Sequence, residues 1–475
     1  MKNNYDIVLV GGGIANIALA LKLIDTDYNV AIFERGHGIY QRQCPKSKTG
    51  VCVDCKPSCQ ITTGFAGAGC FSDTKLTYSS KVGGSLIEYI GKEKFNDLLG
   101  EVDILFKENG ATADFVYDEE FVNKFQYECS KHSLQLIKSP VKHLGTDGSY
   151  EIMKTIWNKL NAAPNIDVFC DSDVTYVNFD ENYIMVVLPT KEKSAFDVPT
   201  QINYKYLSIA VGRYGASWLR DTCIYNGIKL ENTSVDIGVR IECPRAVLDP
   251  VTDGLYEFKI VNYSSSGNKV RTFCVNPGGY VVQENYGTGS EQIKCVNGHS
   301  FSDNKSMNSN FALLVSCNFK DPFNEPIKYA RRICQLANML ADGKPMVQRL
   351  ADLKVHKRSN KTRMERLSIT PTLENAEPGD LRYVLPANII DSIIETLDNL
   401  NNVIPGISGN DTILYAPEVK FYSSKIELNN KLQNDKFDNV FFIGDSSGVT
   451  HGIIQSAMSG IYVANQLLEE NTNED

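Results

Sequence analysis

The chain has 475 residues, which is enough for two or three domains with a large buried core. Hydrophobic residues make up 42% and charged residues 22%, and this composition excludes disordered and fibrous proteins. The net charge of −9 is spread along the chain, so we expect an acidic cytoplasmic protein with no nucleic-acid partner.

The apolar stretch 7–23 near the N-terminus is interrupted by three consecutive glycines and follows Asp6 without a basic leader. We therefore expect neither a signal peptide nor a membrane span in this stretch. The 13 cysteines would then lie in a reducing compartment, where thiols or metal ligands are favoured over disulfides.

The first 35 residues predict one βαβ unit. Residues 5–10 form a continuous apolar run typical of a buried parallel strand, and a glycine turn follows them. Small and apolar residues over 14–24 predict a helix packed on a sheet, and residues 29–34 predict the second strand.

The glycine turn of this unit predicts a nucleotide site. Gly11 allows the tight turn, and Gly13 lets the backbone approach a pyrophosphate at the helix N-terminus. Glu34 ends the second strand, where a carboxylate can bind the ribose hydroxyls. Asn16 replaces the third glycine of this fingerprint and should push the helix slightly off the sheet. The alternative is an ordinary strand–turn–helix without a ligand.

Residues 38–85 are rich in Gly, Cys, Ser and Thr and predict a long functional loop. Further helices are expected over 118–134, 148–162, 326–341, 386–401 and 452–468. Further strands are expected over 166–170, 174–179, 183–188, 204–211, 235–242, 256–261, 269–275, 280–284 and 440–443. The segments between 166 and 211 fit a meander that returns to a central strand.

The C-terminal segment 440–455 (Val-Phe-Phe-Ile-Gly-Asp, then a helix from about Gly452) resembles the second FAD motif of flavoproteins built like glutathione reductase. The resemblance implies that Asp445 binds the ribityl chain or a phosphate. The helix would direct its positive end at the N1/O2 edge of the flavin and stabilise the charge of the reduced ring.

The loop 64–76 resembles the loop that wraps the diphosphate and approaches the isoalloxazine in one group of such flavoproteins, the uncharacterised bacterial FAD-dependent dehydrogenases. Their loop usually reads Gly-Phe-Gly-Gly-Ala-Gly-x-Phe-Ser-Asp-Gly-Lys-Leu, from which Ala66 and Thr74 depart. Other segments resemble the same families, namely 140–147, 206–213, 235–240, 272–279 and 296–300.

The resemblance implies an α/β fold with a Rossmann-like FAD-binding domain built from both chain ends and an inserted β-rich substrate domain. We expect the FAD-binding domain to comprise 1–100, 165–225 and 405–475, with a helical insertion over 101–164 and a substrate domain over 226–404. The residues expected to bind FAD are Gly11, Gly13, Ile14, Ala15, Glu34, Arg35, Gly67, Gly69, Ser72, Lys75, Gly212, Gly444, Asp445, Gly452 and Ile453.

Four cysteines, at 44, 52, 55 and 59, lie within one short stretch of the long loop. Thiolates at such spacing can hold Zn²⁺ or an iron–sulfur cluster, although no standard pattern matches closely. Cys44, Cys52, Cys55 and Cys59 are therefore candidate metal ligands, and a redox thiol pair or inert thiols are the alternatives.

Candidate catalytic residues come from several segments of the chain. Glu418 and Lys420 lie shortly before the final motif, where either could be an acid or base, and a surface charged pair is the alternative. His299 and His451 could transfer protons near neutral pH. Arg240 or Arg271 could hold a substrate carboxylate.

These features predict an FAD-dependent dehydrogenase or reductase that transfers hydride between a small molecule and flavin N5. No second glycine fingerprint occurs in mid-chain, so electrons should pass to or from an external carrier or O₂. The alternatives are an FAD monooxygenase or oxidase, and a non-catalytic flavin-binding redox sensor.

Overall fold

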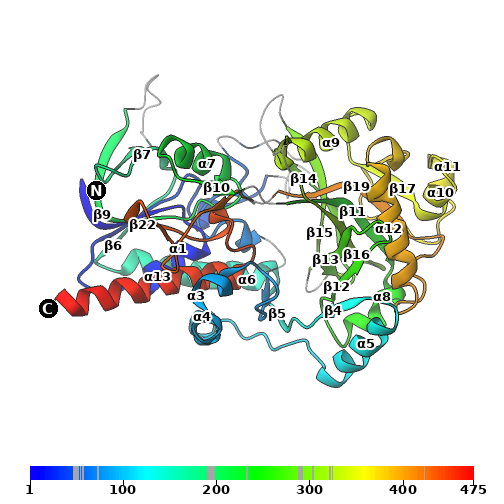
Figure 1. Ribbon diagram of the computed structural model, residues 1–475, viewed down its shortest axis with the longest axis horizontal. Coiled ribbons are helices and arrows are strands. Elements are labelled where there is room, and N and C mark those ends of the chain that lie inside the picture. The colour runs from blue at the N-terminus through cyan, green and yellow to red at the C-terminus, as the bar shows by residue number, and fades with distance from the viewer. Residues whose placement is uncertain are drawn as a thin grey trace. The chain divides into compact units, whose positions relative to one another are not determined.

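The structure is a computed structural model. It describes residues 1–45, 53, 55, 58–71, 74–189, 198–231, 234–286, 292–301, 304–319, 322–323, 325–421 and 423–474. The chain divides into two compact units (Figure 1). Unit 1 comprises Met1–Ala113, His143–Glu231 and Ser423–Asp475, and unit 2 comprises Asp114–Lys142 and Asn232–Tyr422. No helix among the described residues is long and apolar enough to cross a bilayer.

Unit 1 contains an 8-stranded sheet whose central strands run parallel in the order β6–β2–β1–β9–β22. These strands are β1 (Asn4–Val10), β2 (Val30–Phe33), β6 (Ile166–Phe169), β9 (Thr200–Ile209) and β22 (Phe437–Phe442). The antiparallel strands β7 (Asp173–Asn178) and β8 (Tyr183–Val187) form a meander that leads into β9. The meander and its return to a central strand are thus confirmed.

Both faces of this sheet are covered. Helices α1 (Ile14–Lys22), α4 (Lys92–Glu108), α6 (Gly145–Ala162) and α13 (Ile453–Glu474) share one apolar cluster with Ile7 and Leu9 of β1. The β7–β8 meander and α7 (Ala216–Tyr225) pack against the other face, which carries Val8 and Val10. A Cβ at Gly460 would lie 1.9 Å from the Ala15 carbonyl oxygen, so only glycine lets α13 pack this closely on α1.

Unit 2 contains a second 8-stranded sheet, in the order β18–β17–β19–β11–β16–β13–β12–β4. Its strands are β4 (Gln135–Ile137), β11 (Val235–Pro244), β12 (Lys259–Tyr263), β13 (Lys269–Asn276), β16 (Asn308–Cys317), β17 (Met346–Arg349), β18 (Glu377–Pro378) and β19 (Ile413–Lys420). All neighbours are antiparallel except β17 and β18. The hairpin of β14 (Tyr280–Tyr286) and β15 (Ile293–His299) lies outside this sheet.

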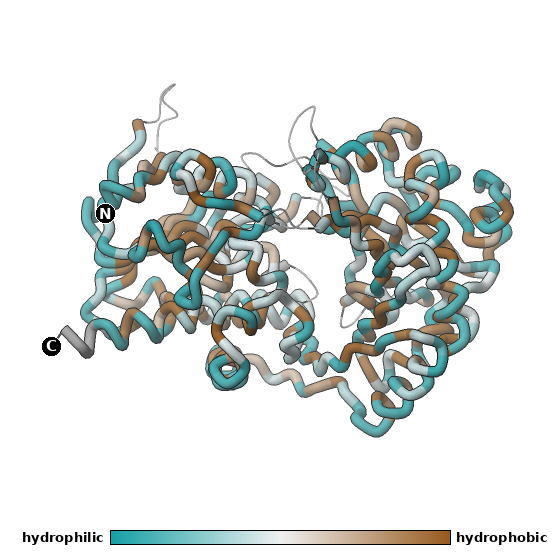
Figure 2. The backbone as a smooth tube through the Cα atoms, in the orientation of Figure 1, coloured by the Kyte–Doolittle hydropathy of each residue, from teal (hydrophilic) through white to brown (hydrophobic). Residues whose placement is uncertain are grey.

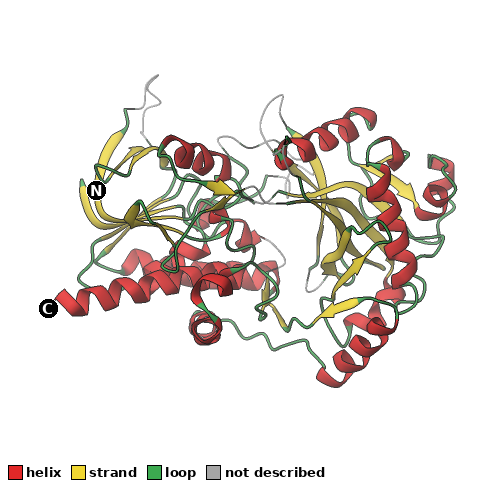
Figure 3. Ribbon diagram, in the orientation of Figure 1, coloured by secondary structure: helices red, strands yellow, loops and turns green. Residues whose placement is uncertain are grey.

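The two faces of the unit 2 sheet differ in chemistry because side chains alternate along a strand. Odd-numbered residues of β11, from Val235 to Cys243, join an apolar cluster with helices α5 (Glu119–Lys131), α8 (Arg245–Thr252), α9 (Pro326–Leu340) and α12 (Ala387–Leu400). Figure 3 shows helices beside the strands of this sheet. The even-numbered residues Asp236, Arg240 and Glu242 give the opposite face a polar character, although they are also buried. Figure 2 shows the apolar stretches along the strands of both units.

The two units divide the chain differently from the predicted segments. Residues 405–422 were expected in the FAD-binding domain, but β19 pairs with β11 and β17 in unit 2. The segment 101–164 was expected as one insertion, but α6 packs on the unit 1 sheet through Ile152 and Ile156. Within this segment, only Asp114–Lys142 belongs to unit 2, because α5 and β4 complete the core of that unit.

Candidate functional site

The turn between β1 and α1 forms a cradle of backbone groups. Gly11 has φ +98°, and a Cβ there would lie 2.4 Å from the Ala210 oxygen, so the turn requires glycine. At Gly13, with φ −81°, a Cβ would meet only the Ala210 oxygen, at 3.8 Å. Helix α1 has neither a side-chain cap nor an acidic residue in its first turn. Its first N–H groups and positive end are therefore suited to an anion.

Asn16 occupies the third fingerprint position and fastens α1 to the sheet. Its Nδ2 donates to the backbone oxygens of Val10 (3.0 Å) and Gly11 (2.9 Å), and its Oδ1 accepts from the Ser208 hydroxyl (2.7 Å). The side chain is fully buried. The expected outward push of the helix is therefore offset by hydrogen bonds that glycine could not make, and the small Ser208 side chain on β9 provides the room.

Glu34 lies at the end of β2 with 7% of its surface exposed. Its Oε2 accepts from the Gly12 N–H (2.7 Å), and its Oε1 accepts from the Gly36 N–H (2.8 Å). A carboxylate has about four lone-pair sites, so both oxygens can still accept a hydroxyl. The neighbouring Arg35 is exposed and lies 3.6 Å from Asp173.

The glycine-rich loop reaches the same turn. The Ala66 N–H donates to the Gly12 oxygen (2.7 Å), and a Cβ at Gly67 would lie 3.5 Å from the Gly13 Cα. A Cβ at Gly69 would lie 3.4 Å from the Ile453 side chain at the start of α13. The predicted Ser72 lies outside the described residues.

Arg42 holds this loop in shape and was not predicted from the sequence. The side chain is 1% exposed, and its guanidinium donates to the carbonyl oxygens of the loop, at Gln60 (3.0 Å), Ile61 (2.7 Å), Gly64 (3.4 Å), Phe65 (2.6 Å) and Gly67 (2.8 Å). No periodic pattern marks such a residue, because its partners are backbone atoms. Phe65 also packs edge-to-face on Trp157 of α6, with ring centroids 4.7 Å apart.

The two departures from the family loop pattern fall at left-handed backbone positions. Ala66 has φ +75° and Thr74 has φ +40°, where the resembled loop carries glycine. A side chain in this region costs roughly 1–2 kcal/mol. The Thr74 hydroxyl donates to the Gly69 oxygen (2.8 Å), which offsets part of that cost. Ala66 has no such compensation in its side chain.

We expect Ala66→Gly to stabilise the protein, because glycine relieves the left-handed strain. The strain exceeds the extra chain entropy of glycine, so the free energy of unfolding should rise by about 0.5–1 kcal/mol. Urea unfolding measures this change. Ala68→Gly, in a helical turn of the same loop without positive φ, should instead lower stability. An equal loss in both variants would contradict strain at Ala66.

The C-terminal motif meets the N-terminal one at α1. A Cβ at Gly444, which follows β22, would lie 3.2 Å from the Ala15 Cβ. The Asp445 Oδ1 accepts from the hydroxyls of Thr450 (3.1 Å) and Ser456 (3.0 Å), and its Oδ2 accepts from Arg213 Nε (3.2 Å). Arg213 thus positions Asp445.

These residues fit the adenosine diphosphate and ribityl parts of FAD. The open position beside Gly13 admits a diphosphate, and α1 provides unneutralised N–H groups. The other predicted residues of this group are also in unit 1. Gly212 follows β9 and has no atom within 4 Å of an added Cβ, Gly452 precedes α13, and Lys75 begins β3 (Lys75–Thr77).

The cysteine loop stays a prediction. Cys44, Cys55 and Cys59 are half-buried, and Cys52 lies outside the described residues. In the part of the chain that the structure describes, no three His, Cys, Asp or Glu side chains gather closely enough to hold a metal ion.

In unit 2, the polar face of the sheet is centred on Arg240, which is fully buried. Its guanidinium makes a bidentate ion pair with the Glu418 carboxylate, through Nε (2.7 Å) and Nη2 (2.6 Å). The other donors bind the Cys274 oxygen (2.9 Å), Asn310 Oδ1 (3.1 Å) and Asn297 Oδ1 (3.0 Å). Burial disfavours the charged guanidinium, but Glu418 outweighs it and holds the pKa of Arg240 above its ordinary value.

The hydrogen bonds of Arg240 join three of the segments that resemble the FAD-dependent dehydrogenases, 235–240, 272–279 and 296–300. A Cβ at Gly298 would lie 2.5 Å from Arg240 Nη1 and 2.2 Å from Asn310 Oδ1, so glycine is required there. All five N–H donors of the guanidinium are used, and none is left for a substrate carboxylate. The suggestion that Arg240 binds substrate is therefore not supported.

Two of the predicted catalytic residues, Glu418 and Lys420 on β19, belong to the same face, and His299 ends β15 of the separate hairpin. Glu418 is fully buried against Arg240, so it is not an exposed charged pair. Lys420 Nζ lies 3.1 Å from Glu418 Oε1. Glu284 on β14 interacts with Lys420 and with the remaining candidate, His299. Burial raises the pKa of Glu284, but Lys420, hydrogen bonds from Asn297 and Tyr286, and His299 together hold that pKa below its usual value. The assignment of catalysis to these residues stays a prediction.

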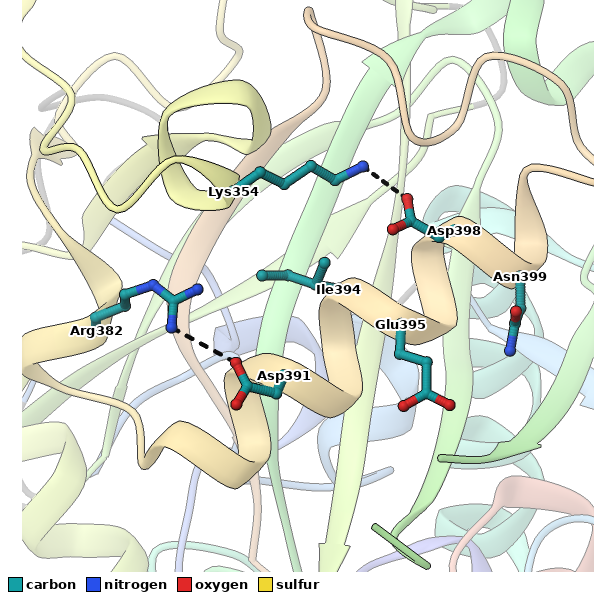
Figure 4. A pocket seen from close by; sticks show the side chains of 7 residues that line it. All are labelled: Lys354, Arg382, Asp391, Ile394, Glu395, Asp398 and Asn399. Atoms are coloured by element: carbon teal, nitrogen blue, oxygen red, sulfur yellow. Dashed lines mark hydrogen bonds and ion pairs between the residues drawn. The ribbon is translucent and has the colours of Figure 1, made fainter. Parts of the chain in front are cut away.

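A separate pocket of about 430 Å³ lies beside α12 of unit 2 (Figure 4). Its charged side chains face one another, since Lys354 binds Asp398 (2.6 Å) and Arg382 lies 3.5 Å from Asp391. None of the residues predicted from the sequence to bind the cofactor, to bind a metal or to take part in catalysis lines this pocket.

Residues 234–421 match the family described as "FAD-dependent protein, C-terminal domain-like". The matched residues form most of unit 2, and the match supports an FAD-dependent protein. An uncharacterized protein of Clostridium beijerinckii is 25% identical over 487 aligned positions, which cover 98% of this chain and 80% of that protein.

Two solved structures align with the chain at low similarity. p-Nitrophenol 4-monooxygenase PnpA from Pseudomonas putida DLL-E4 has a TM-score of 0.39 and 10% identity, covering 100% of this chain and 82% of that chain. Glycine oxidase from Geobacillus kaustophilus has a TM-score of 0.41 and 12% identity, covering 98% and 95%. At these scores the two structures do not bear on the activity of this chain.

Proposed function

We propose that the protein is an FAD-dependent oxidoreductase, a dehydrogenase or reductase of a small organic molecule. Unit 1 is, in this proposal, a Rossmann-type dinucleotide-binding domain of the glutathione-reductase type, assembled from both ends of the chain. The observation that carries the proposal is the meeting of three glycine segments, at Gly13, Gly67 and Gly444, around the uncapped start of α1.

The residues of unit 1 have distinct roles in this proposal. The N–H groups at the start of α1 hold the diphosphate, and Glu34 accepts hydrogen bonds from the adenosine ribose. Arg42 keeps the loop at 64–67 in the shape that covers the diphosphate. Asp445, oriented by Arg213, accepts from a ribityl hydroxyl. When bound, FAD supplies the acceptor or donor of a hydride at its N5 atom.

Unit 2 supplies the substrate-binding residues in this proposal. His299 is the candidate for proton transfer near neutral pH, since an imidazole titrates in that range. Lys420 is the candidate for orienting the substrate, and Glu418 positions Lys420 through their ion pair. An external electron donor or acceptor completes the turnover.

Reconstitution with FAD tests the proposal. We expect the purified protein to take up one FAD per chain and to show the absorption of an oxidised flavin. Candidate metabolites are then added one at a time under anaerobic conditions, and we expect one of them to reduce the flavin and bleach its absorption. A protein that takes up no FAD would contradict the proposal. Substrate-dependent O₂ consumption with product hydroxylation would instead indicate a monooxygenase.

A further inference from the structure

Three cationic side chains surround one aromatic ring on the polar face of the unit 2 sheet. Lys259 Nζ lies 5.3 Å from the centroid of the Phe273 ring, the Arg271 guanidinium carbon 5.0 Å, and Lys420 Nζ 5.4 Å. The residues come from β12, β13 and β19. We call these four residues the cation face.

The two lysines of the cation face are unusually enclosed. Lys259 is 8% exposed and Lys420 is 6% exposed, although lysine is rarely buried without full pairing. Among the residues that the structure describes, each ammonium group contacts a single carboxylate. Lys259 binds Glu257 at 2.7 Å, and Lys420 binds Glu418 at 3.1 Å.

An ammonium group carries three N–H donors, so each lysine retains donor capacity beyond one carboxylate and the face of the Phe273 ring. Lys420 has a further deficit, because the Glu418 carboxylate already binds Arg240 through both oxygens. Buried donors without acceptors are costly, and they indicate a missing acceptor at this face.

The carboxylates around the cation face indicate which chemical class of ligand could be the missing acceptor. Asp236 binds Arg271 at 2.6 Å, and Glu257, Glu284 and Glu418 face the lysines. All these carboxylates belong to the protein: Asp236 lies with Arg271 and Glu257 with Lys259, whereas Glu418 is shared by Arg240 and Lys420. A ligand carboxylate beside the Phe273 ring would accept hydrogen bonds from the remaining donors, and it would reduce the repulsion among the three cations around that ring.

We propose that the cation face binds a small molecule through a carboxylate group, with Lys259 and Lys420 donating to the carboxylate and Arg271 adding positive charge. The inference deepens the proposed function. It rests on that function only in identifying the bound carboxylate as the substrate. The carboxylate binding itself is measurable whether or not the protein binds FAD.

Calorimetric titration of the full-length protein tests the inference. Acetate, benzoate and succinate are each compared with the corresponding neutral amide. We expect at least one carboxylate to bind about tenfold or more tightly than its amide, and added salt should weaken only the carboxylate. If no carboxylate binds more tightly than its amide, the inference is overturned. Flavin absorption, measured on the same sample, tests the proposed function separately.

A paired variant identifies the site. Lys259→Met combined with Glu257→Gln removes the ammonium group without leaving an unpaired buried carboxylate. We expect it to weaken the carboxylate about tenfold while the amide is unaffected. The matched control is Lys131→Met combined with Glu128→Gln, an exposed ion pair at 2.8 Å on α5 of the same unit. Unchanged carboxylate affinity in the first variant, with an unchanged melting temperature, would overturn the assignment.

Discussion

Gly13→Ala should abolish most FAD binding without unfolding the protein. Gly13 has φ −81°, which alanine adopts readily, and the new methyl group would meet only the Ala210 oxygen, at 3.8 Å. The methyl group would, however, occupy the space through which a diphosphate approaches α1. We expect FAD affinity to fall about 100-fold, or roughly 3 kcal/mol, in a fluorescence titration of the apoprotein.

Two further glycine variants make this test specific. Gly148→Ala in α6 adds a methyl group with no atom within 4 Å, so it should leave FAD affinity unchanged. Gly11→Ala combines φ +98° with a 2.4 Å approach to the Ala210 oxygen, so it should lower the stability of the apoprotein itself. Wild-type FAD affinity in Gly13→Ala would show that the diphosphate does not lie at this turn.

Arg240→Met should cause the largest loss of stability among single substitutions in unit 2. The change leaves the fully buried Glu418 carboxylate without its two-pronged partner, and it removes the donors to Asn297 and Asn310. Removing one member of a buried ion pair costs about 3–5 kcal/mol. Urea unfolding followed by far-ultraviolet circular dichroism measures this loss.

The tryptophans provide an internal comparison, because Trp157 and Trp218 both lie in unit 1. Their fluorescence reports on unit 1, whereas circular dichroism reports on both units. The matched control is Arg245→Met, whose half-exposed partner Asp249 lies 3.0 Å away. That variant should lose only about 0–1 kcal/mol. If Arg240→Met were no less stable than the control, Arg240 would not organise the polar face.

The cofactor-binding half of the site could be predicted largely because its signals are local. Gly11 and Gly13 stand next to an apolar strand, and Gly444 and Asp445 follow another, so each motif lies within one strand–turn–helix segment. Helix α4 carried a readable signal that was missed, since Phe95, Leu98, Val102 and Leu105 recur at helical spacing and are buried. Arg42 carried no such signal, because it binds backbone oxygens that any sequence would provide.

The sequence by itself determined the parallel strands, the glycine turns and the positions where the family loop pattern is broken, because backbone sterics and alternating burial act over a few residues. Only the tertiary structure decided that β19 belongs to unit 2 and that Lys259, Arg271 and Lys420 share one ring. Antiparallel pairing joins strands that are far apart in the chain, and its register depends on the whole sheet. The partners of a buried charge are therefore fixed by strand order, which no local pattern encodes.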